Sequence, residues 1–139
     1  MKFVKLLNLK IIGDIEKGFL SYFELNNDFD FEIKRIYFMF DVPKNSIRGY
    51  HAHKTLKQVM FCAFGKIKIV INNGTSSKSF ILDTPNKVLV MTRGFWREIY
   101  YLLPNSVLVV GASDIFSEDD YIRDYDKFLE FSLKGGYNQ

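Results

Sequence analysis

Turn residues divide the middle of this chain into short strands at regular spacing, and this punctuation restricts the fold more than any other feature. Seven segments rich in β-branched and aromatic residues follow one another: 49–53, 57–64, 66–72, 78–82, 87–92, 97–103 and 106–112. Between two of them, Asn73-Gly74 is a strong hairpin signal because both residues tolerate a positive φ. Many short strands with such turns predict a sandwich or barrel of the jelly-roll kind.

The two ends of the chain extend this pattern and add one helix. Segments 3–12, 19–24 and 31–42 are predicted strands. Ser117 and the three acidic residues after it resemble a capping box, and an apolar face of helical period follows. We therefore expect an all-β chain with one short α-helix, from about 118 to 132, near its carboxyl end.

Side chains of the strand predicted at 31–42 alternate between two faces. One face is apolar apart from its lysine, and we expect it to pack against the core or a partner: Lys34, Ile36, Phe38 and Phe40. The opposite face is amphipathic, and we expect it to line a pocket: Arg35, Tyr37 and Met39.

Length and composition restrict the class of protein. The 139 residues fit a single domain, 1–139, and a hydrophobic fraction of 47% is enough for a sizeable core. The net charge of +3 is small, which argues against nucleic acid but allows a basic pocket for an anionic small molecule. Cys62 is the only cysteine, so an intrachain disulfide is excluded. Because the chain shows neither a signal peptide nor an apolar run that could span a membrane, we expect a cytoplasmic protein.

Both histidines of the chain lie in the stretch 48–53, Arg-Gly-Tyr-His-Ala-His. Residues two positions apart on a strand project from the same face, so the two imidazoles should lie side by side. Such a pair suits either metal ligation or proton transfer near neutral pH. A purely structural pair is the third interpretation, and the neighbouring residues argue against it.

The spacing of His51, His53 and Gln58 resembles the first cupin signature, with glutamine in place of the usual glutamate. Arg97 stands where the second cupin signature has histidine. An amide carries no charge and an arginine is a fixed cation that cannot ligate a metal. We therefore predict a cupin-type jelly roll with no metal and no cofactor, in which the histidines are free to move protons. Alternation sends Trp96 to the face opposite Arg97.

Three further motifs lie before and after the histidine stretch: Ile-Lys-Arg-Ile-Tyr at 33–37, Trp-Arg-Glu at 96–98, and Ala-Ser-Asp at 112–114 leading to the segment 120–126. Together with the histidine stretch, they resemble the dTDP-4-keto-6-deoxyglucose 3,4-ketoisomerases over nearly the whole chain. The resemblance implies a metal-free cupin homodimer with strands exchanged between subunits. It also implies a dTDP-linked 4-keto-6-deoxy sugar as substrate and a role in making 3-amino-3,6-dideoxyhexoses of bacterial surface polysaccharides.

The resemblance also assigns roles to residues. It makes His51 the catalytic base and Tyr37 a catalytic or proton-relay group, with His53 beside them. Arg48 matches a position near the nucleotide diphosphate. The other candidates for substrate binding are Arg35, Lys17, Gln58 and Arg97. Positions 17 and 97 vary in this family and are connected with the configuration of the product at C4. The combination of Lys17 and Arg97 leaves two products open, 3-keto-6-deoxygalactose and 3-keto-6-deoxyglucose.

The expected reaction requires no redox cofactor, because the ketone moves from C4 to C3 by proton transfer through an enediolate. A neutral histidine can remove a proton next to a carbonyl, and general base catalysis of this kind contributes about 10²–10⁴-fold. One alternative is a dTDP-4-keto-sugar 3,5-epimerase, which would remove a proton without moving the ketone. The short chain and the His-x-His pair argue against it. Another alternative is a cupin that binds a sugar nucleotide or a metal without catalysis.

Overall fold

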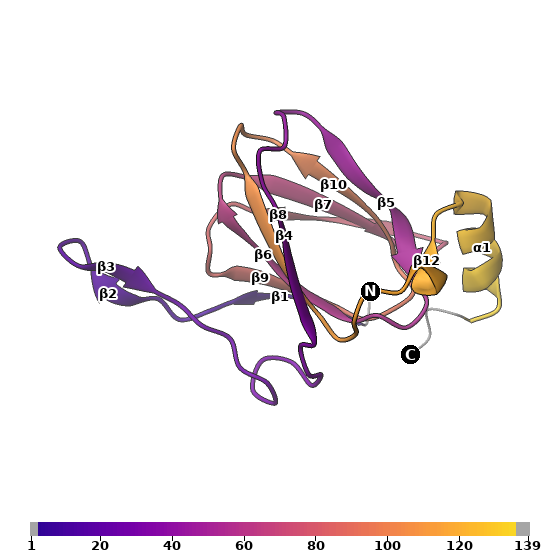
Figure 1. The fold of residues 1–139 in the computed structure, drawn as a ribbon, viewed down its shortest axis with the longest axis horizontal. Coiled ribbons are helices and arrows are strands. Elements are labelled where there is room, and N and C mark those ends of the chain that lie inside the picture. The colour runs from indigo at the N-terminus through magenta and orange to yellow at the C-terminus, as the bar shows by residue number, and fades with distance from the viewer. Residues whose placement is uncertain (1–2, 136–139) are drawn as a thin grey trace.

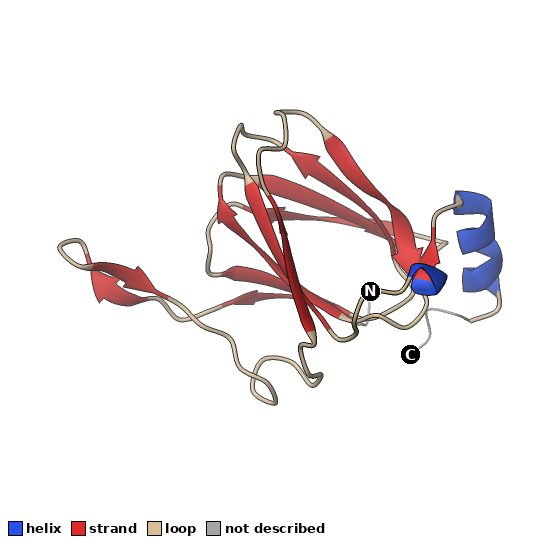
Figure 2. Ribbon diagram, viewed as in Figure 1, coloured by secondary structure: helices blue, strands red, loops and turns tan. Residues whose placement is uncertain are grey.

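A computed structural model describes residues 3–135, and most of its regular structure is β (Figure 2). The strands are β1 (Val4–Asn8), β2 (Ile12–Asp14), β3 (Gly18–Leu20), β4 (Arg35–Met39), β5 (Ile47–His53), β6 (Gln58–Phe64), β7 (Ile67–Asn72), β8 (Ser77–Leu82), β9 (Lys87–Met91), β10 (Trp96–Tyr101), β11 (Val107–Ala112) and β12 (Tyr121–Ile122). A 3₁₀ turn, η1 (Glu118–Asp120), and one helix, α1 (Tyr125–Leu133), complete the described chain. The predicted all-β class with one short carboxyl-terminal helix is confirmed.

Two five-stranded sheets face each other as a sandwich (Figure 1). The first sheet has the order β1-β9-β6-β11-β4 and the second the order β12-β5-β10-β7-β8, with antiparallel neighbours throughout. Consecutive strands repeatedly cross from one sheet to the other, as the predicted cupin-type jelly roll requires.

The core lies between the two sheets and follows the period of two along the strands. Ile67, Ile69 and Ile71 of β7 have no exposed surface, and they belong to one apolar cluster with residues of the opposite sheet. On the outer face of the second sheet, Trp96 packs against Phe128 of α1, with ring centroids 5.7 Å apart. Trp96 therefore faces away from the core, as alternation predicts. No helix in the stretch 3–135 is long and apolar enough to cross a membrane.

The amino-terminal strands are shorter than predicted. The segment 3–12 is divided, because β1 pairs with β9 only until Asn8 meets Lys87, where β9 begins. The chain then leaves the sheet and forms a separate hairpin from β2 and β3, which projects from the sandwich (Figure 1). The strand predicted at 19–24 contributes only its first two residues, Phe19 and Leu20, to β3.

Strand β4 is also shorter than the predicted 31–42, and its apolar face does not join the core of this chain. Ile36, Phe38 and Phe40 are 63%, 59% and 60% exposed. Phe31 lies outside the strand, in a second apolar cluster that includes Phe29. Of the two expectations for the apolar face, packing against the core is wrong, and a partner remains the alternative.

The helix begins seven residues later than predicted. Asp124, not Ser117, is its N-cap, and the Asp124 carboxylate accepts a hydrogen bond from the backbone N–H of Lys127 at 3.0 Å. Ser117 makes no side-chain capping bond. Tyr121 and Ile122, predicted on the helix, instead form β12 and pair with β5. The capping-box pattern was misleading because Asp120 is held by β5 and the loop after it.

Candidate active site

Five of the predicted site residues meet between the two sheets, together with one that was not predicted. They come from separate strands: Tyr37 from β4, His51 and His53 from β5, Gln58 from β6, Arg97 from β10 and Tyr121 from β12. The hydrogen bond from Arg97 to Gln58 joins the two sheets directly. Residues far apart in the sequence thus form one cluster because the jelly roll brings these strands together.

A β-bulge sets the direction of the histidine strand. His51 is opposite Arg97 and Gly49 is opposite Glu98, so Tyr50 is an extra residue without a partner. Gly49 and Tyr50 have φ values of 94° and 53°. A Cβ on Gly49 would lie 2.8 Å from the carbonyl oxygen of Arg97. Glycine is therefore required at position 49, because any other residue would combine a strained φ with a steric clash.

The two imidazoles lie on the same strand face, with ring centroids 4.9 Å apart and planes at 84°. The Nδ1 of His51 is 3.0 Å from the carbonyl oxygen of Gly49, and the Nδ1 of His53 is 2.8 Å from the Oδ2 of Asp120. Because these oxygens accept hydrogen bonds, each Nδ1 carries the proton of the neutral ring. Both Nε2 atoms therefore hold lone pairs inside the site.

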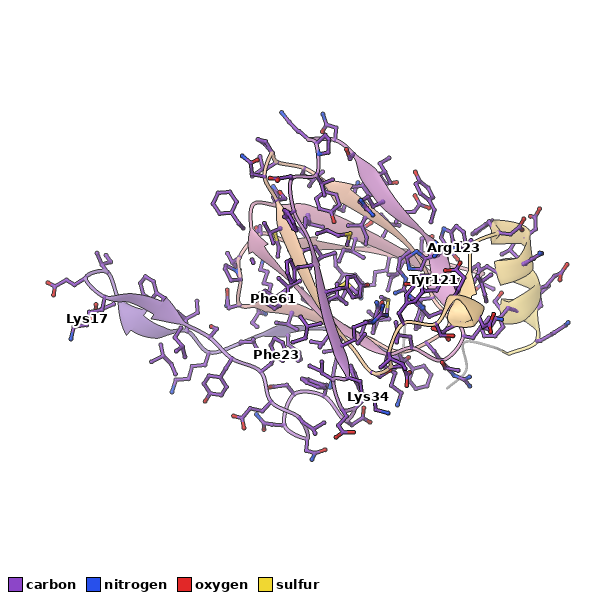
Figure 3. The ribbon with its side chains drawn as sticks, in the orientation of Figure 1. Lys17, Phe23, Lys34, Phe61, Tyr121 and Arg123 are labelled. Atoms are coloured by element: carbon purple, nitrogen blue, oxygen red, sulfur yellow. The ribbon has the colours of Figure 1, made fainter. Side chains whose placement is uncertain are left out.

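Tyr121 covers the histidine pair. Its ring centroid lies 5.0 Å from that of His51 and 4.5 Å from that of His53. The guanidinium of Arg123 is 4.2 Å from the Tyr121 ring centroid and makes a bidentate ion pair with Glu118. Figure 3 shows Tyr121 and Arg123 next to each other on the side of the molecule that carries α1.

A chain of hydrogen bonds runs from Arg97 through Gln58 to Tyr37. The Nη1 of Arg97 donates to the Oε1 of Gln58, and the Nε2 of Gln58 donates to the Tyr37 hydroxyl at 2.8 Å. The Nη2 of Arg97 donates to the carbonyl oxygen of Phe95 at 2.9 Å. Because the Tyr37 oxygen accepts from the amide, its own proton is free to be donated into the site.

The site is electropositive and keeps its histidines neutral. Burial and the Arg97 charge lower the pKa of His51 to about 3, and the same two causes lower the pKa of His53. Burial lowers the pKa of Arg97 to about 10, so the guanidinium is still charged at neutral pH. Burial raises the pKa of Tyr37, which keeps its hydroxyl protonated. Neutral proton acceptors beside a fixed cation suit chemistry that develops negative charge.

The residues do not fit the metal that the cupin fold commonly holds. Gln58 stands where such a site has a carboxylate ligand, and its amide oxygen already accepts a hydrogen bond from Arg97. Arg97 itself stands where such a site has a histidine ligand, and a guanidinium cannot ligate a metal. Instead, polar atoms without a hydrogen-bond partner concentrate here. Of five such buried side-chain atoms in the part of the chain that the structure describes, four belong to this region: Arg35 Nε, His51 Nε2, His53 Nε2 and Arg97 Nε. Such unpaired groups suit a polar organic ligand.

The other three predicted residues differ in position. Arg35 lies beside the cluster, with its guanidinium 5.2 Å from the Tyr37 ring centroid. Arg48 lies on β5 opposite the buried Ile99, so its side chain leaves the same face of the sheet as the core residues. Its side chain is nevertheless exposed to solvent. Lys17 is not near the cluster within one chain, because it lies in the projecting β2–β3 hairpin (Figure 3).

Asp120 and Tyr121 were not predicted as site residues. Both lie in the segment 120–126, which the sequence pattern assigned to a helix. Their position depends on the pairing of β12 with β5, and a strand of two residues gives no periodic signal.

Comparison with known proteins gives consistent results over nearly the whole chain. A family model described as "FdtA: WxcM-like, C-terminal" matches residues 2–132. The TDP-4-oxo-6-deoxy-alpha-D-glucose-3,4-oxoisomerase of Aneurinibacillus thermoaerophilus is 37% identical over 130 residues, which are 94% of this chain and 93% of the relative. The crystal structure of a 3,4-ketoisomerase from Helicobacter canadensis has 41% identity and a TM-score of 0.88, and covers 94% of this chain and 97% of that one.

A variant of the 3,4-ketoisomerase QdtA from Thermoanaerobacterium thermosaccharolyticum, with one histidine replaced by asparagine, has been solved with TDP-4-keto-6-deoxyglucose. It has 36% identity and a TM-score of 0.90, covering 96% of each chain. The dTDP-4-dehydrorhamnose 3,5-epimerase of Bacillus anthracis is more distant, with 19% identity and a TM-score of 0.76 over 85% of this chain and 76% of that one. That likeness shows a shared fold alone.

Proposed function

This chain belongs to the FdtA family, whose relatives include sugar-nucleotide 3,4-ketoisomerases, and we propose that it converts dTDP-4-keto-6-deoxyglucose to a dTDP-3-keto-6-deoxyhexose. The observation that carries the proposal is the pair of neutral imidazoles, each with an unprotonated Nε2, beside a buried guanidinium. This set can remove a carbon-bound proton and stabilise the oxyanion that results.

In the proposed mechanism, the Nε2 of His51 removes the proton from C3, and the electron pair forms the C3–C4 double bond of an enediolate. The positive charge of Arg97 stabilises the oxygen that becomes negative. Tyr37 gives its proton to O4 and takes the proton of O3. The His51 imidazolium then returns its proton to C4, and the C3 ketone forms. Protons and electrons balance without a redox partner.

The low pKa of His51 in the free protein is compatible with this role. The substrate brings a diphosphate and develops a further negative charge, and both favour protonation of a nearby imidazole. His51 therefore becomes more basic as the reaction needs it, and remains neutral before substrate binds.

The test is to incubate the protein with dTDP-4-keto-6-deoxyglucose, trap the product with a PLP-dependent 3-aminotransferase and glutamate as the amino donor, and determine its structure by NMR. A 3-amino sugar supports the proposal, and its configuration at C4 identifies the product that Lys17 and Arg97 leave undecided. An epimerised sugar that keeps its ketone at C4 would favour the 3,5-epimerase, and unchanged substrate would favour a binding protein.

The proposal includes a homodimer in which the β2–β3 hairpin packs on the partner. Two regions support it: the hairpin, where Ile15 and Phe19 are 93% and 65% exposed, and the apolar outer face of β4. A two-stranded hairpin alone is marginally stable in water, and apolar faces of this kind are typical of an interface. The exchange would carry Lys17 towards the partner's site. Sedimentation at micromolar concentration should give a dimer, and a monomer would contradict this part.

The product is expected to serve the synthesis of 3-amino-3,6-dideoxyhexoses for bacterial surface polysaccharides. A cytoplasmic location is part of the same proposal, supported by the single buried thiol of Cys62, which suits a reducing compartment.

A further inference from the structure

We propose that Asp120 is a positioning residue of the ketoisomerase: it fixes His53 in the tautomer that presents an unprotonated Nε2 to the site. The inference rests on the proposed function for its effect on catalysis, but the tautomer itself can be measured without substrate. His53 Nε2 would then accept a hydrogen bond from a substrate hydroxyl while His51 acts as the base.

Three hydrogen-bond donors converge on the Asp120 carboxylate. Oδ2 accepts from the Nδ1–H of His53 at 2.8 Å. Oδ1 accepts from the backbone N–H of Thr55 at 2.7 Å and from the Thr55 hydroxyl at 2.8 Å. The side chains of His53 and Asp120 are 1% and 13% exposed, so water competes little for these contacts. Both carboxylate oxygens are therefore needed as acceptors.

An asparagine at this position cannot satisfy the same donors. An amide has one acceptor oxygen and one donor NH₂ group. If the oxygen stays with the two donors of Thr55, the NH₂ group faces the Nδ1 of His53. That nitrogen must then become the acceptor, so the ring proton moves to Nε2. The reversed amide would instead point NH₂ at the backbone N–H of Thr55, leaving two donors in contact.

The change of tautomer would affect both histidines. A His53 Nε2–H would offer a donor where the wild-type ring offers an acceptor, so a substrate hydroxyl would lose its partner. The ring of His51 is only 4.9 Å away by centroid, and the new donor would compete for the lone pair of the base. A histidine in the wrong tautomer reduces kcat strongly even when the geometry is retained.

The backbone around Asp120 is held independently of its side chain. The Asp120 carbonyl oxygen accepts from the backbone N–H of Lys54 at 2.9 Å, and its own N–H donates to the carbonyl oxygen of Ser117 at 3.2 Å. Next to it, Tyr121 pairs with His53 in the sheet. Asp120→Asn changes no bond of this backbone frame, so the variant should keep the fold.

The experiment is NMR of the 139-residue chain without substrate, with ¹⁵N-labelled histidine, followed by steady-state kinetics. The chain has two histidines, so a spectrum of His51→Asn assigns the signals of His53. Wild type should show His53 protonated at Nδ1, and Asp120→Asn should move that proton to Nε2. The kcat of Asp120→Asn should fall at least about 10²-fold with a smaller change in KM. Asp119→Asn removes the same charge at an exposed neighbour, and should retain both the tautomer and kcat.

Three results would overturn the inference. They are a wild-type His53 protonated at Nε2, an Asp120→Asn protein that loses turnover without a change of tautomer, and a changed tautomer with unchanged turnover. If the wild-type protein had no isomerase activity, the proposed function would fail. The wild-type and Asp120→Asn spectra would still decide whether Asp120 sets the His53 tautomer.

Discussion

Replacing Gln58 by leucine should destabilise the protein through two specific hydrogen bonds. The side chain is 1% exposed, accepts from the charged Arg97 and donates to the Tyr37 hydroxyl. A hydrogen bond to a charged group contributes about 1.5–3 kcal/mol and a neutral one about 0.5–1.5 kcal/mol. Leucine has a similar volume and leaves both partners unpaired, so the free energy of unfolding should fall by about 2–4.5 kcal/mol.

Urea unfolding at one fixed protein concentration measures this loss, because the stability of an oligomer depends on concentration. Two matched variants separate the contributions. Gln58→Glu keeps an acceptor for Arg97 and can accept from the Tyr37 hydroxyl, so its loss should be below about 1 kcal/mol. Tyr37→Phe removes only the neutral bond. If Gln58→Leu cost no more than Tyr37→Phe, the bond between Arg97 and Gln58 would not stabilise the fold, and the reasoning would be wrong.

Three further predictions follow from the same geometry. Gly49→Ala combines a positive φ with a contact to the Arg97 carbonyl and should cost on the order of 3 kcal/mol in urea unfolding, whereas Gly18→Ala has free space and should cost less. The pKa values of His51 and His53 are lower in the folded protein than in the unfolded chain, so the unfolded state binds more protons below about pH 6.5. The free energy of unfolding should therefore fall by up to about 1.4 kcal/mol per pH unit per histidine as the pH is lowered from about 6.5 to about 5. A free energy of unfolding that does not change over this range would contradict the depressed pKa values. Elemental analysis should find no stoichiometric metal and EDTA should leave turnover unchanged, whereas one zinc or iron per chain, lost together with activity, would refute the metal-free site.

The sequence predicted what depends on strand periodicity. Two imidazoles at positions 51 and 53 had to share a face, and Trp96 and Arg97 had to separate. The inward face of β4 likewise followed from alternation, which brings Tyr37 to the Gln58 amide. These predictions needed only that the segments were strands, which the turn residues already indicated.

Other parts of the site depend on tertiary contacts that leave no local pattern. Asp120 looked like a helix-capping acid because Ser117 precedes it by three residues, but His53 and Thr55 offer it three donors. The break between β1 and β2 occurs because β9, the strand that pairs with β1, begins at Lys87 opposite Asn8. The sequence of the segment 3–12 alone does not show where β9 begins. Lys17 was predicted at the site, and its place in a projecting hairpin shows that one chain alone does not bring it there.

The central claim is that His51 removes the C3 proton of dTDP-4-keto-6-deoxyglucose. The most direct measurement compares wild type and His51→Asn in D₂O, following deuterium incorporation at C3 of the substrate by NMR and affinity for the dTDP-sugar by calorimetry. We expect turnover of His51→Asn to fall by on the order of 10²-fold or more and C3 exchange to disappear, with affinity little changed. Exchange at C3 near the wild-type rate in His51→Asn would contradict the claim and transfer the role of base to His53 or Tyr37.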